Sequence, residues 1–478
     1  MRKAGTGDRE WGLGEGAALR ADLLEADPRK ARLLFPPPVP HPSPQFQPEL
    51  LRFTTAGSVD DGKSTLIGRL LYDSKGVYED QVASIRKATR NQTTGGLDLS
   101  LLTDGLRAER EQGITIDVAY RYFSTARRKF IIADTPGHEQ YTRNMATGAS
   151  TANLAIILID ARYGVLPQSR RHAYIASLLG IPHMVVAVNK MDLVEFRQEV
   201  FDEIRADFET FAGQLEIRDI EFIPISALDG DNVVMRSART PWYEGPTLLG
   251  HLENVHIASD WNLNTFRFPV QWVNRPNNPT DHSVHDFRGL SGQIASGIIR
   301  KGQQVVVLPV GIKTTVKDIW TYDGSVAEAF CPQSITLCLE HDIDVSRGDM
   351  IVGLENLPGR SAELSARVCW MHQRPLQPGK KYFLKHTTQT VQAAVTQIEN
   401  KINFDTLEPE AAPAALTMND IGGIRLKTAK PLVFDGYQTN RLTGSFVLIE
   451  QGTNATVAAG MLAAPTEAVK PEYEDFAI

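Results

Sequence analysis

Between residues 50 and 252, short runs of consecutive apolar residues alternate with segments whose apolar positions repeat at helical spacing. The runs Phe130–Ala133, Ala155–Ile159 and Val185–Val188 predict strands that are buried on both faces, as in a parallel sheet covered by helices. The segment Ser169–Leu179, between two of these runs, predicts an amphipathic helix. This alternation predicts a doubly wound α/β domain with a mostly parallel sheet over residues 49–258.

The pattern changes after about residue 266, where short β-rich runs are separated by Gly and Pro. Regularly spaced short strands of this kind predict two all-β barrel domains, over residues 265–360 and 361–466. Residues 1–48 contain few apolar positions and a proline run, which predicts a disordered N-terminal extension. Residues 467–478 are expected to form a short tail.

Composition narrows the class of protein. The 478 residues are 42% hydrophobic and 22% charged, the balance of a soluble globular protein. Fifty Lys and Arg against 57 Asp and Glu give a net charge of −7, which argues against broad binding to nucleic acid or to an anionic membrane. No apolar run approaches the roughly 18 residues of a membrane helix, and the three cysteines lack metal-ligand spacing. We therefore expect a cytoplasmic protein.

The strongest motif lies between the strand-like run Leu51–Ala56 and the helix-like segment Thr65–Leu71. It has the pattern G-x-x-x-x-G-K-[ST], in which glycines let backbone N–H groups surround phosphate oxygens at a helix N-terminus. The lysine reaches the β- and γ-phosphates and the serine hydroxyl binds Mg²⁺. The predicted phosphate-binding residues are Gly57, Ser58, Val59, Asp60, Asp61, Gly62, Lys63, Ser64 and Thr65.

A second motif, Asp134-Thr135-Pro136-Gly137, follows the buried run Phe130–Ala133. Nucleotide sites in open α/β sheets lie at the carboxyl ends of the strands. The Asp134 carboxylate can hold Mg²⁺, directly or through water, and the Gly137 N–H can sense a γ-phosphate. This segment is therefore a candidate switch.

The third motif, Asn189-Lys190-Met191-Asp192, again follows a buried run. The Asp192 carboxylate can accept hydrogen bonds from guanine N1 and N2, and adenine offers no such pair of donors on that edge. Ser226-Ala227-Leu228 follows the segment Glu221–Ile225, and the Ala227 N–H could meet guanine O6.

Thr115, within Gln112–Ile116, is the candidate switch threonine, although a plain β-strand threonine is the alternative interpretation. The predicted magnesium ligands are thus Ser64, Thr115 and Asp134. Four motifs in this order predict a GTPase with GTP and Mg²⁺ as cofactors.

The segments Ala108–Asp117 and Asp134–Glu139 resemble the translation-factor class of GTPases. That resemblance implies that His138 orients the attacking water, with Lys63 and Thr115 as the other catalytic residues. A solvent-facing His138 without a catalytic role is the alternative.

The resemblance then narrows to the large, GTP-hydrolysing subunit of bacterial sulfate adenylyltransferase (ATP sulfurylase). It rests on Asp61, where translation factors usually have histidine, and on the segments Gly57–Leu70, Asp117–Phe123, His138–Ser150 and Phe268–Pro276. It implies three domains and a heterodimer with a small catalytic subunit, which makes adenosine 5′-phosphosulfate and pyrophosphate from ATP and sulfate while this chain hydrolyses GTP.

The chain contains no S-G-G-x-D-S or H-x-G-H adenylyl-transfer motif, so we do not expect it to transfer AMP alone. Two alternatives stay open at this point. One is a translation elongation factor that delivers aminoacyl-tRNA, and the other is a regulatory GTPase without a metabolic partner.

Overall fold

A computed structural model describes residues 50–74, 99, 118–136 and 142–466, with gaps at residues 214, 216, 218, 258–260, 276–286, 405, 407 and 412. The predicted N-terminal extension, the C-terminal tail and the site residues Thr115, Gly137 and His138 lie outside the described residues. Within them, the chain forms an α/β domain and then two all-β domains, so the predicted fold class is confirmed. None of the helices in the described part of the chain is long and apolar enough to cross a membrane.

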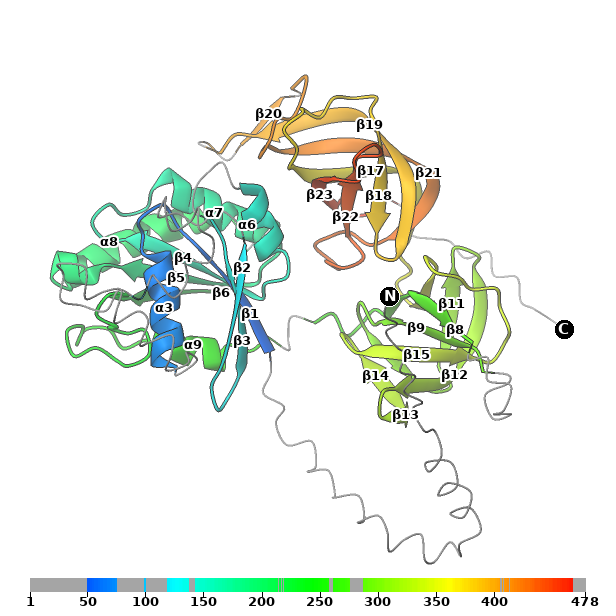
Figure 1. Cartoon of the computed structure of the whole chain (residues 1–478), viewed down its shortest axis with the longest axis horizontal. Coiled ribbons are helices and arrows are strands. Elements are labelled where there is room, and N and C mark those ends of the chain that lie inside the picture. Colours follow the sequence, from blue (N-terminus) through cyan, green and yellow to red (C-terminus); the bar gives the residue numbers. More distant parts are fainter. Residues whose placement is uncertain are drawn as a thin grey trace, which may run out of the picture. The chain divides into compact units, whose positions relative to one another are not determined.

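The α/β domain is built on a six-stranded sheet in the order β2-β3-β1-β4-β5-β6 (Figure 1). All neighbouring strands pair in parallel except β2, which runs antiparallel to β3 at one edge. The strands are β1 (Leu50–Ala56), β2 (Ala119–Ser124), β3 (Lys129–Asp134), β4 (Leu154–Asp160), β5 (His183–Asn189) and β6 (Asp219–Pro224). The helices are α3 (Lys63–Asp73), α6 (Thr142–Ala149), α7 (Pro167–Leu178), α8 (Gln198–Ala212) and α9 (Leu248–Asn254), with a 3-10 turn η3 (Met191–Val194).

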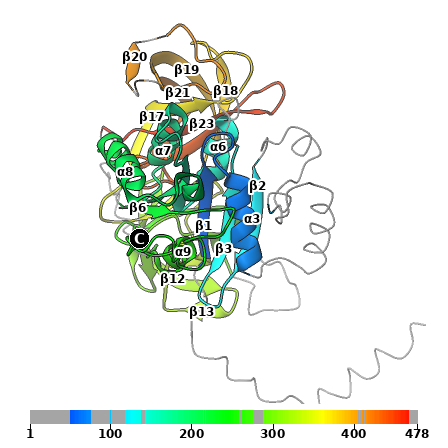
Figure 2. The same cartoon turned by 90° about the vertical axis from the view of Figure 1, so that its left-hand side faces the viewer.

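Strand β4 shows why the runs predicted as buried strands are continuously apolar. Its alternate side chains enter two separate cores: Leu154, Ile156 and Leu158 pack with α3 and α9, whereas Ala155, Ile157 and Ile159 pack with α6, α7 and α8. Figure 2 shows α3 on one side of the sheet and α7 and α8 on the other. Since five strands are parallel, their carboxyl ends and the loops that follow them share one edge of the sheet.

The first β domain consists of strands β7 to β16 and the second of β17 to β23 (Figure 1). The first contains β7 (Arg267–Pro269), β8 (Trp272–Asn274), β9 (Gly289–Gln293), β10 (Ile298–Arg300), β11 (Gln304–Leu308), β12 (Ile312–Thr321), β13 (Gly324–Val326), β14 (Glu328–Phe330), β15 (Ser334–Leu339) and β16 (Met350–Gly353). The second contains β17 (Gly359–Trp370), β18 (Lys381–His386), β19 (Gln389–Ile402), β20 (Pro409–Ala411), β21 (Ile421–Phe434), β22 (Ser445–Ile449) and β23 (Thr456–Leu462). Pairing of β18 with β19 closes the second sheet into a barrel, and β20 extends the sheet from β19 outside the closed ring.

A buried ion pair joins the two β domains. Arg267 at the start of β7 is 2% exposed, and its Nε and Nη2 atoms lie 2.9 Å and 3.0 Å from the two carboxylate oxygens of Asp435. The Thr443 hydroxyl donates to the same carboxylate at 2.7 Å. Because the guanidinium is buried away from water, its positive charge is stabilised by the Asp435 carboxylate.

We expect Asp435→Ala to destabilise the β domains by about 3–5 kcal/mol, because it leaves a buried guanidinium without its carboxylate. The matched control is Glu399→Ala, which removes the partner of Arg425 in a solvent-exposed pair and is expected to cost less than about 1 kcal/mol. Thermal unfolding followed by circular dichroism measures both. Equal shifts in melting temperature for the two variants would show that the buried pair contributes no more to stability than the exposed pair.

Candidate functional site

The loop between β1 and α3 curls tightly, and one glycine in it is required by a close contact. Gly62 has a φ of 90°, and a Cβ at this position would lie 2.5 Å from the Asn189 Nδ2 atom. Asp60 also has a positive φ, of 66°. These two left-handed residues turn the chain into the first turn of α3, whose N-terminus carries the partial positive charge that favours phosphate.

Lys63 is held inside this loop. Its side chain is buried, and its ammonium donates to the carbonyl oxygens of Gly57 at 2.8 Å and Ser58 at 2.7 Å. Burial lowers the pKa of Lys63, and the nearby carboxylates of Asp61 and Asp134 oppose that shift. The Ser58 hydroxyl is buried with no hydrogen-bond partner among the described residues. A buried cation beside an unsatisfied hydroxyl fits the binding of a phosphate.

Asp61 lies in the same loop and is also buried. Its carboxylate accepts a hydrogen bond from the Ser58 N–H at 2.5 Å. Burial raises the pKa of Asp61 to about 6, against the attraction of Lys63, which lowers it. This carboxyl group therefore changes its charge close to neutral pH.

Asp134 and Thr135 follow β3 at the same edge of the sheet. Asp134 is buried and lies beside Thr55 of β1 in the parallel register. The Thr135 hydroxyl donates to the Thr55 carbonyl at 2.6 Å, which fixes the chain as it leaves the strand. Ser64 lies in the first turn of α3. A hydroxyl and a carboxylate beside a phosphate loop are the oxygen ligands that suit Mg²⁺.

Asn189 at the end of β5 joins the phosphate loop to the predicted base-binding loops. Its side-chain Nδ2 donates to the Asp61 carbonyl at 2.7 Å, and its Oδ1 accepts from the Ala227 N–H at 2.9 Å. Both bonds are buried. The sequence predicted that Ala227 meets guanine O6, whereas here its N–H also serves this internal bond. Asp192 is half-buried in η3, directly after the loop.

Asp160 at the end of β4 is a residue of this edge that the sequence analysis missed. Its carboxylate lies 2.9 Å from the Lys190 ammonium and 2.7 Å from the Arg162 guanidinium. Burial raises the pKa of Asp160, but the hydrogen bonds from Arg162 and Lys190 outweigh it and lower the pKa to about 2. Lys190 also donates to the Asp60 carbonyl, so it braces the phosphate loop from the base side. The available signal was its place at the carboxyl end of a buried strand.

His172 on α7 is a second missed residue. Burial, together with the positive charges of Lys63 and Arg171, lowers its pKa to about 3. The imidazole is therefore neutral at physiological pH and adds no positive charge to that of Lys63. Its Nε2 lies 3.2 Å from Gln168 Nε2.

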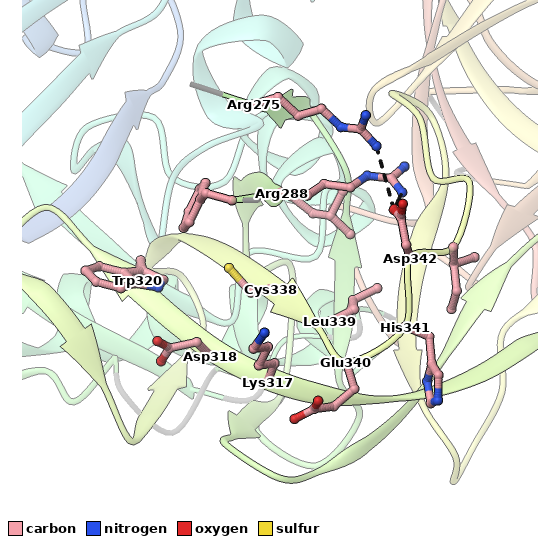
Figure 3. Close-up of a pocket in the computed structure, with 13 residues that line it drawn as sticks. Arg275, Arg288, Lys317, Asp318, Trp320, Cys338, Leu339, Glu340, His341 and Asp342 are labelled. Carbon is pink, nitrogen blue, oxygen red and sulfur yellow. Dashed lines mark hydrogen bonds and ion pairs between the residues drawn. The ribbon is translucent and has the colours of Figure 1, made fainter. Parts of the chain in front are cut away.

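The structure brings the phosphate loop, Asp134–Pro136, Asn189–Asp192 and Ser226–Leu228 to one edge of the sheet. Thr115, Gly137 and His138 lie outside the described residues. A cavity of about 780 Å³ lies away from these residues, in the first β domain (Figure 3). In Figure 3 the guanidinium groups of Arg275 and Arg288 meet the Asp342 carboxylate at its rim. None of the predicted GTP-site residues lines it.

Comparison with known proteins places this geometry in a family. The model of the elongation factor Tu GTP binding domain matches residues 48–264, and that of the GTP-eEF1A C-terminal domain-like family matches residues 363–463. Sulfate adenylyltransferase subunit 1 of Pseudoalteromonas atlantica is 54% identical over 434 residues, which cover 90% of this chain and 91% of that protein. The same subunit of Bacteroides fragilis is 56% identical over 87% of this chain and 86% of that protein.

A longer relative matches over part of its length. The bifunctional enzyme CysN/CysC of Rhodopirellula baltica is 58% identical over 420 residues. These residues cover 87% of this chain, and the chain spans 64% of the length of that enzyme.

We expect Asn189→Ala to weaken GDP binding by about 10²-fold, because it removes two buried hydrogen bonds that hold the phosphate and base loops together. The matched control is Asn254→Ala on α9, whose side-chain amide donates to the Gly250 carbonyl at the surface. Titration with a fluorescent GDP analogue measures both affinities. Wild-type affinity in Asn189→Ala would show that the two loops hold their places without this amide.

A second variant tests the raised pKa of Asp61. Above about pH 6 the carboxylate is ionised and repels phosphate, so Asp61→Asn is expected to bind GDP more tightly than the wild type at pH 7.5. At pH 5.5 the wild-type carboxyl is largely protonated, and the affinity ratio should fall, by up to about tenfold. Taking the ratio of the two proteins cancels the titration of GDP itself. A ratio independent of pH would contradict the assigned shift.

Proposed function

The chain belongs to the sulfate adenylyltransferase subunit 1 family, and on that premise we propose that it is the GTP-hydrolysing subunit that drives adenosine 5′-phosphosulfate synthesis. The reaction joins ATP and sulfate to give adenosine 5′-phosphosulfate and pyrophosphate. The phosphate–sulfate anhydride that forms is higher in energy than the ATP anhydride that breaks, so the step gains from coupling to GTP hydrolysis. The observation that carries this proposal is the joined phosphate and base site, on a chain similar to these relatives over about nine-tenths of its length.

We assign the GTP contacts to the residues that the sequence predicted. The buried Lys63 ammonium and the N–H groups of the loop 57–62 face phosphate, and Asp192 accepts the guanine N1 and N2 hydrogens. Ser226, Ala227 and Leu228 close the base pocket. In this assignment the Ala227 N–H donates a bifurcated hydrogen bond to Asn189 Oδ1 and to guanine O6.

Magnesium fits the donor set at this edge. Ser64 and Asp134 supply a hydroxyl and a carboxylate, and Thr115 is proposed as the third protein ligand. When bound, Mg²⁺ neutralises charge on the phosphates. The proposed role of His138 is to hold the attacking water by a hydrogen bond, which orients it without a further protein nucleophile.

The proposed partner is the small catalytic subunit of sulfate adenylyltransferase. This chain has no motif of its own for adenylyl transfer, so a second subunit must supply that chemistry. The proposed place of action is the cytoplasm, which suits the three buried, unpaired cysteines Cys331, Cys338 and Cys369. The relatives favour this function over an elongation factor that delivers aminoacyl-tRNA.

GTP hydrolysis by the purified chain tests this proposal. We expect the rate to rise when the small subunit, ATP and sulfate are present together, and to stay low when any one is omitted. Phosphate release from GTP is the readout. Hydrolysis that is indifferent to all three but rises with ribosomes would return the chain to the elongation-factor class.

Asp192→Asn tests the assigned base contact. Xanthine offers an acceptor where guanine offers a donor, so the variant should lose GTP affinity and gain affinity for xanthosine triphosphate. The loss for GTP is expected to be about 10²-fold, since a buried hydrogen-bonding pair is mismatched. Competition between the two nucleotides measures the preference. An unchanged preference for guanine would remove Asp192 from the base pocket.

A further inference from the structure

The edge strand β2 carries two exposed tyrosines on one face of the sheet. Tyr120 is 45% exposed and Tyr122 is 66% exposed, and in the antiparallel register they stand opposite Ala133 and Ile131 of β3. Because side chains alternate along a strand, both tyrosines point to the side of α6. Figure 1 shows β2 at the margin of the sheet.

The same face is hollowed beside the tyrosines. A cavity of about 200 Å³ is lined by Tyr120, Tyr122 and Ile131 on the sheet and by Gly148, Thr151 and Ala152 at the end of α6. Arg52 of β1 stands opposite Ile131 and forms the rim. Helix α6 lies close to the sheet at Gly148, where a Cβ would lie 2.8 Å from Thr135. The row Tyr122–Ile131–Arg52 lines the hollow beside it.

The charge of this face is opposite to that of the whole chain. Its charged side chains are Arg52 and Lys129, both exposed, whereas the chain has a net charge of −7. Arg121 alternates with the two tyrosines and so belongs to the opposite face, Arg128 is buried against the carbonyls of Leu252 and Val255, and Arg127 pairs with Glu253. Lys129 pairs with Leu50 in the register, two positions from Arg52 on the same face. Aromatic and arginine side chains around an apolar hollow are the composition of binding hot spots.

This face is one strand away from the candidate magnesium ligand. Ala119 of β2 pairs with Asp134 of β3, and Asp134 in turn lies beside Thr55 at the end of β1. A partner that pulls or tilts β2 thus acts on the strand that carries Asp134.

We propose that Arg52, Tyr120, Tyr122 and Lys129 form the docking face for an acidic segment of the small catalytic subunit, with one apolar side chain of that segment in the hollow. The inference rests on the proposed function, since it places the partner named there. The first β domain also exposes Trp272, Trp320 and Tyr322, which line a cavity of about 460 Å³ with Arg347 as its charged lining residue. That surface belongs to another domain, and side chains of that domain provide the controls.

Binding of the purified small subunit to the full chain is measured by calorimetry for two test variants and two controls. Tyr122→Ser and Lys129→Glu are each expected to raise Kd by about tenfold, and only the Lys129→Glu effect should shrink at high salt. The controls Tyr322→Ser and Lys317→Glu change an exposed tyrosine and an exposed lysine of the first β domain and should stay within about twofold of the wild type. Unchanged GDP affinity in every variant shows that the chain is folded.

The outcomes separate the two proposals. A wild-type chain that does not bind the small subunit overturns the partner assigned under the proposed function, and this inference with it. Wild-type binding that Tyr122→Ser and Lys129→Glu leave intact overturns the docking face alone. Self-association of the chain in light scattering that Tyr122→Ser abolishes would assign the face to a second copy, and the inference would be wrong.

Discussion

The side-chain amide of Asn189 is the interaction on which the nucleotide site depends. It donates to the phosphate loop through the Asp61 carbonyl and accepts from the loop after β6 through the Ala227 N–H. The amide can approach so closely only because Gly62 has no Cβ. One buried group thus sets the distance between the proposed phosphate loop and the proposed base loop. Loss of the two Asn189 hydrogen bonds would leave buried polar atoms on both loops without a partner, and this cost keeps the loops in place.

Charge is arranged around this brace with little solvent access. Lys63 is buried, with the carboxylates of Asp61 and Asp134 near it. Lys190 pairs with Asp160, and hydrogen bonds from Arg162 and Lys190 hold the pKa of Asp160 at about 2. The neutral His172 avoids a second positive charge beside Lys63. Burial raises the pKa of Asp61 to about 6, so this carboxyl group is a point at which the site responds to pH.

The second β domain is tied to the α/β domain just past the end of α6. The Arg441 guanidinium donates to the carbonyls of Ser150 at 2.8 Å and Ala152 at 3.3 Å, just past α6, and the Tyr437 hydroxyl donates to the Leu179 carbonyl after α7. These contacts lie beside the hollow next to Tyr120. A partner on that face would therefore touch the same helix end that the second β domain holds.

The sequence predicted the sheet and the site motifs because both rest on local patterns, such as the apolar run Ala155–Ile159 and the loop Gly57–Ser64. It missed Asp160 and His172 because neither belongs to a motif, and their roles come from neighbours brought close by the sheet. The Arg267–Asp435 pair joins residues 168 positions apart, which no periodicity encodes. Asn189 was predicted as a base-loop residue, but its role as a brace depends on the missing Cβ of Gly62, which lets the amide approach.

Pyrophosphate release by the two-subunit complex, with ATP and sulfate saturating, tests the central claim most directly. We expect GTP to raise the extent of sulfate-dependent pyrophosphate formation, and GDP or a non-hydrolysable GTP analogue not to raise it. An equal extent with and without hydrolysable GTP would contradict the coupling and leave a GTPase without the proposed task.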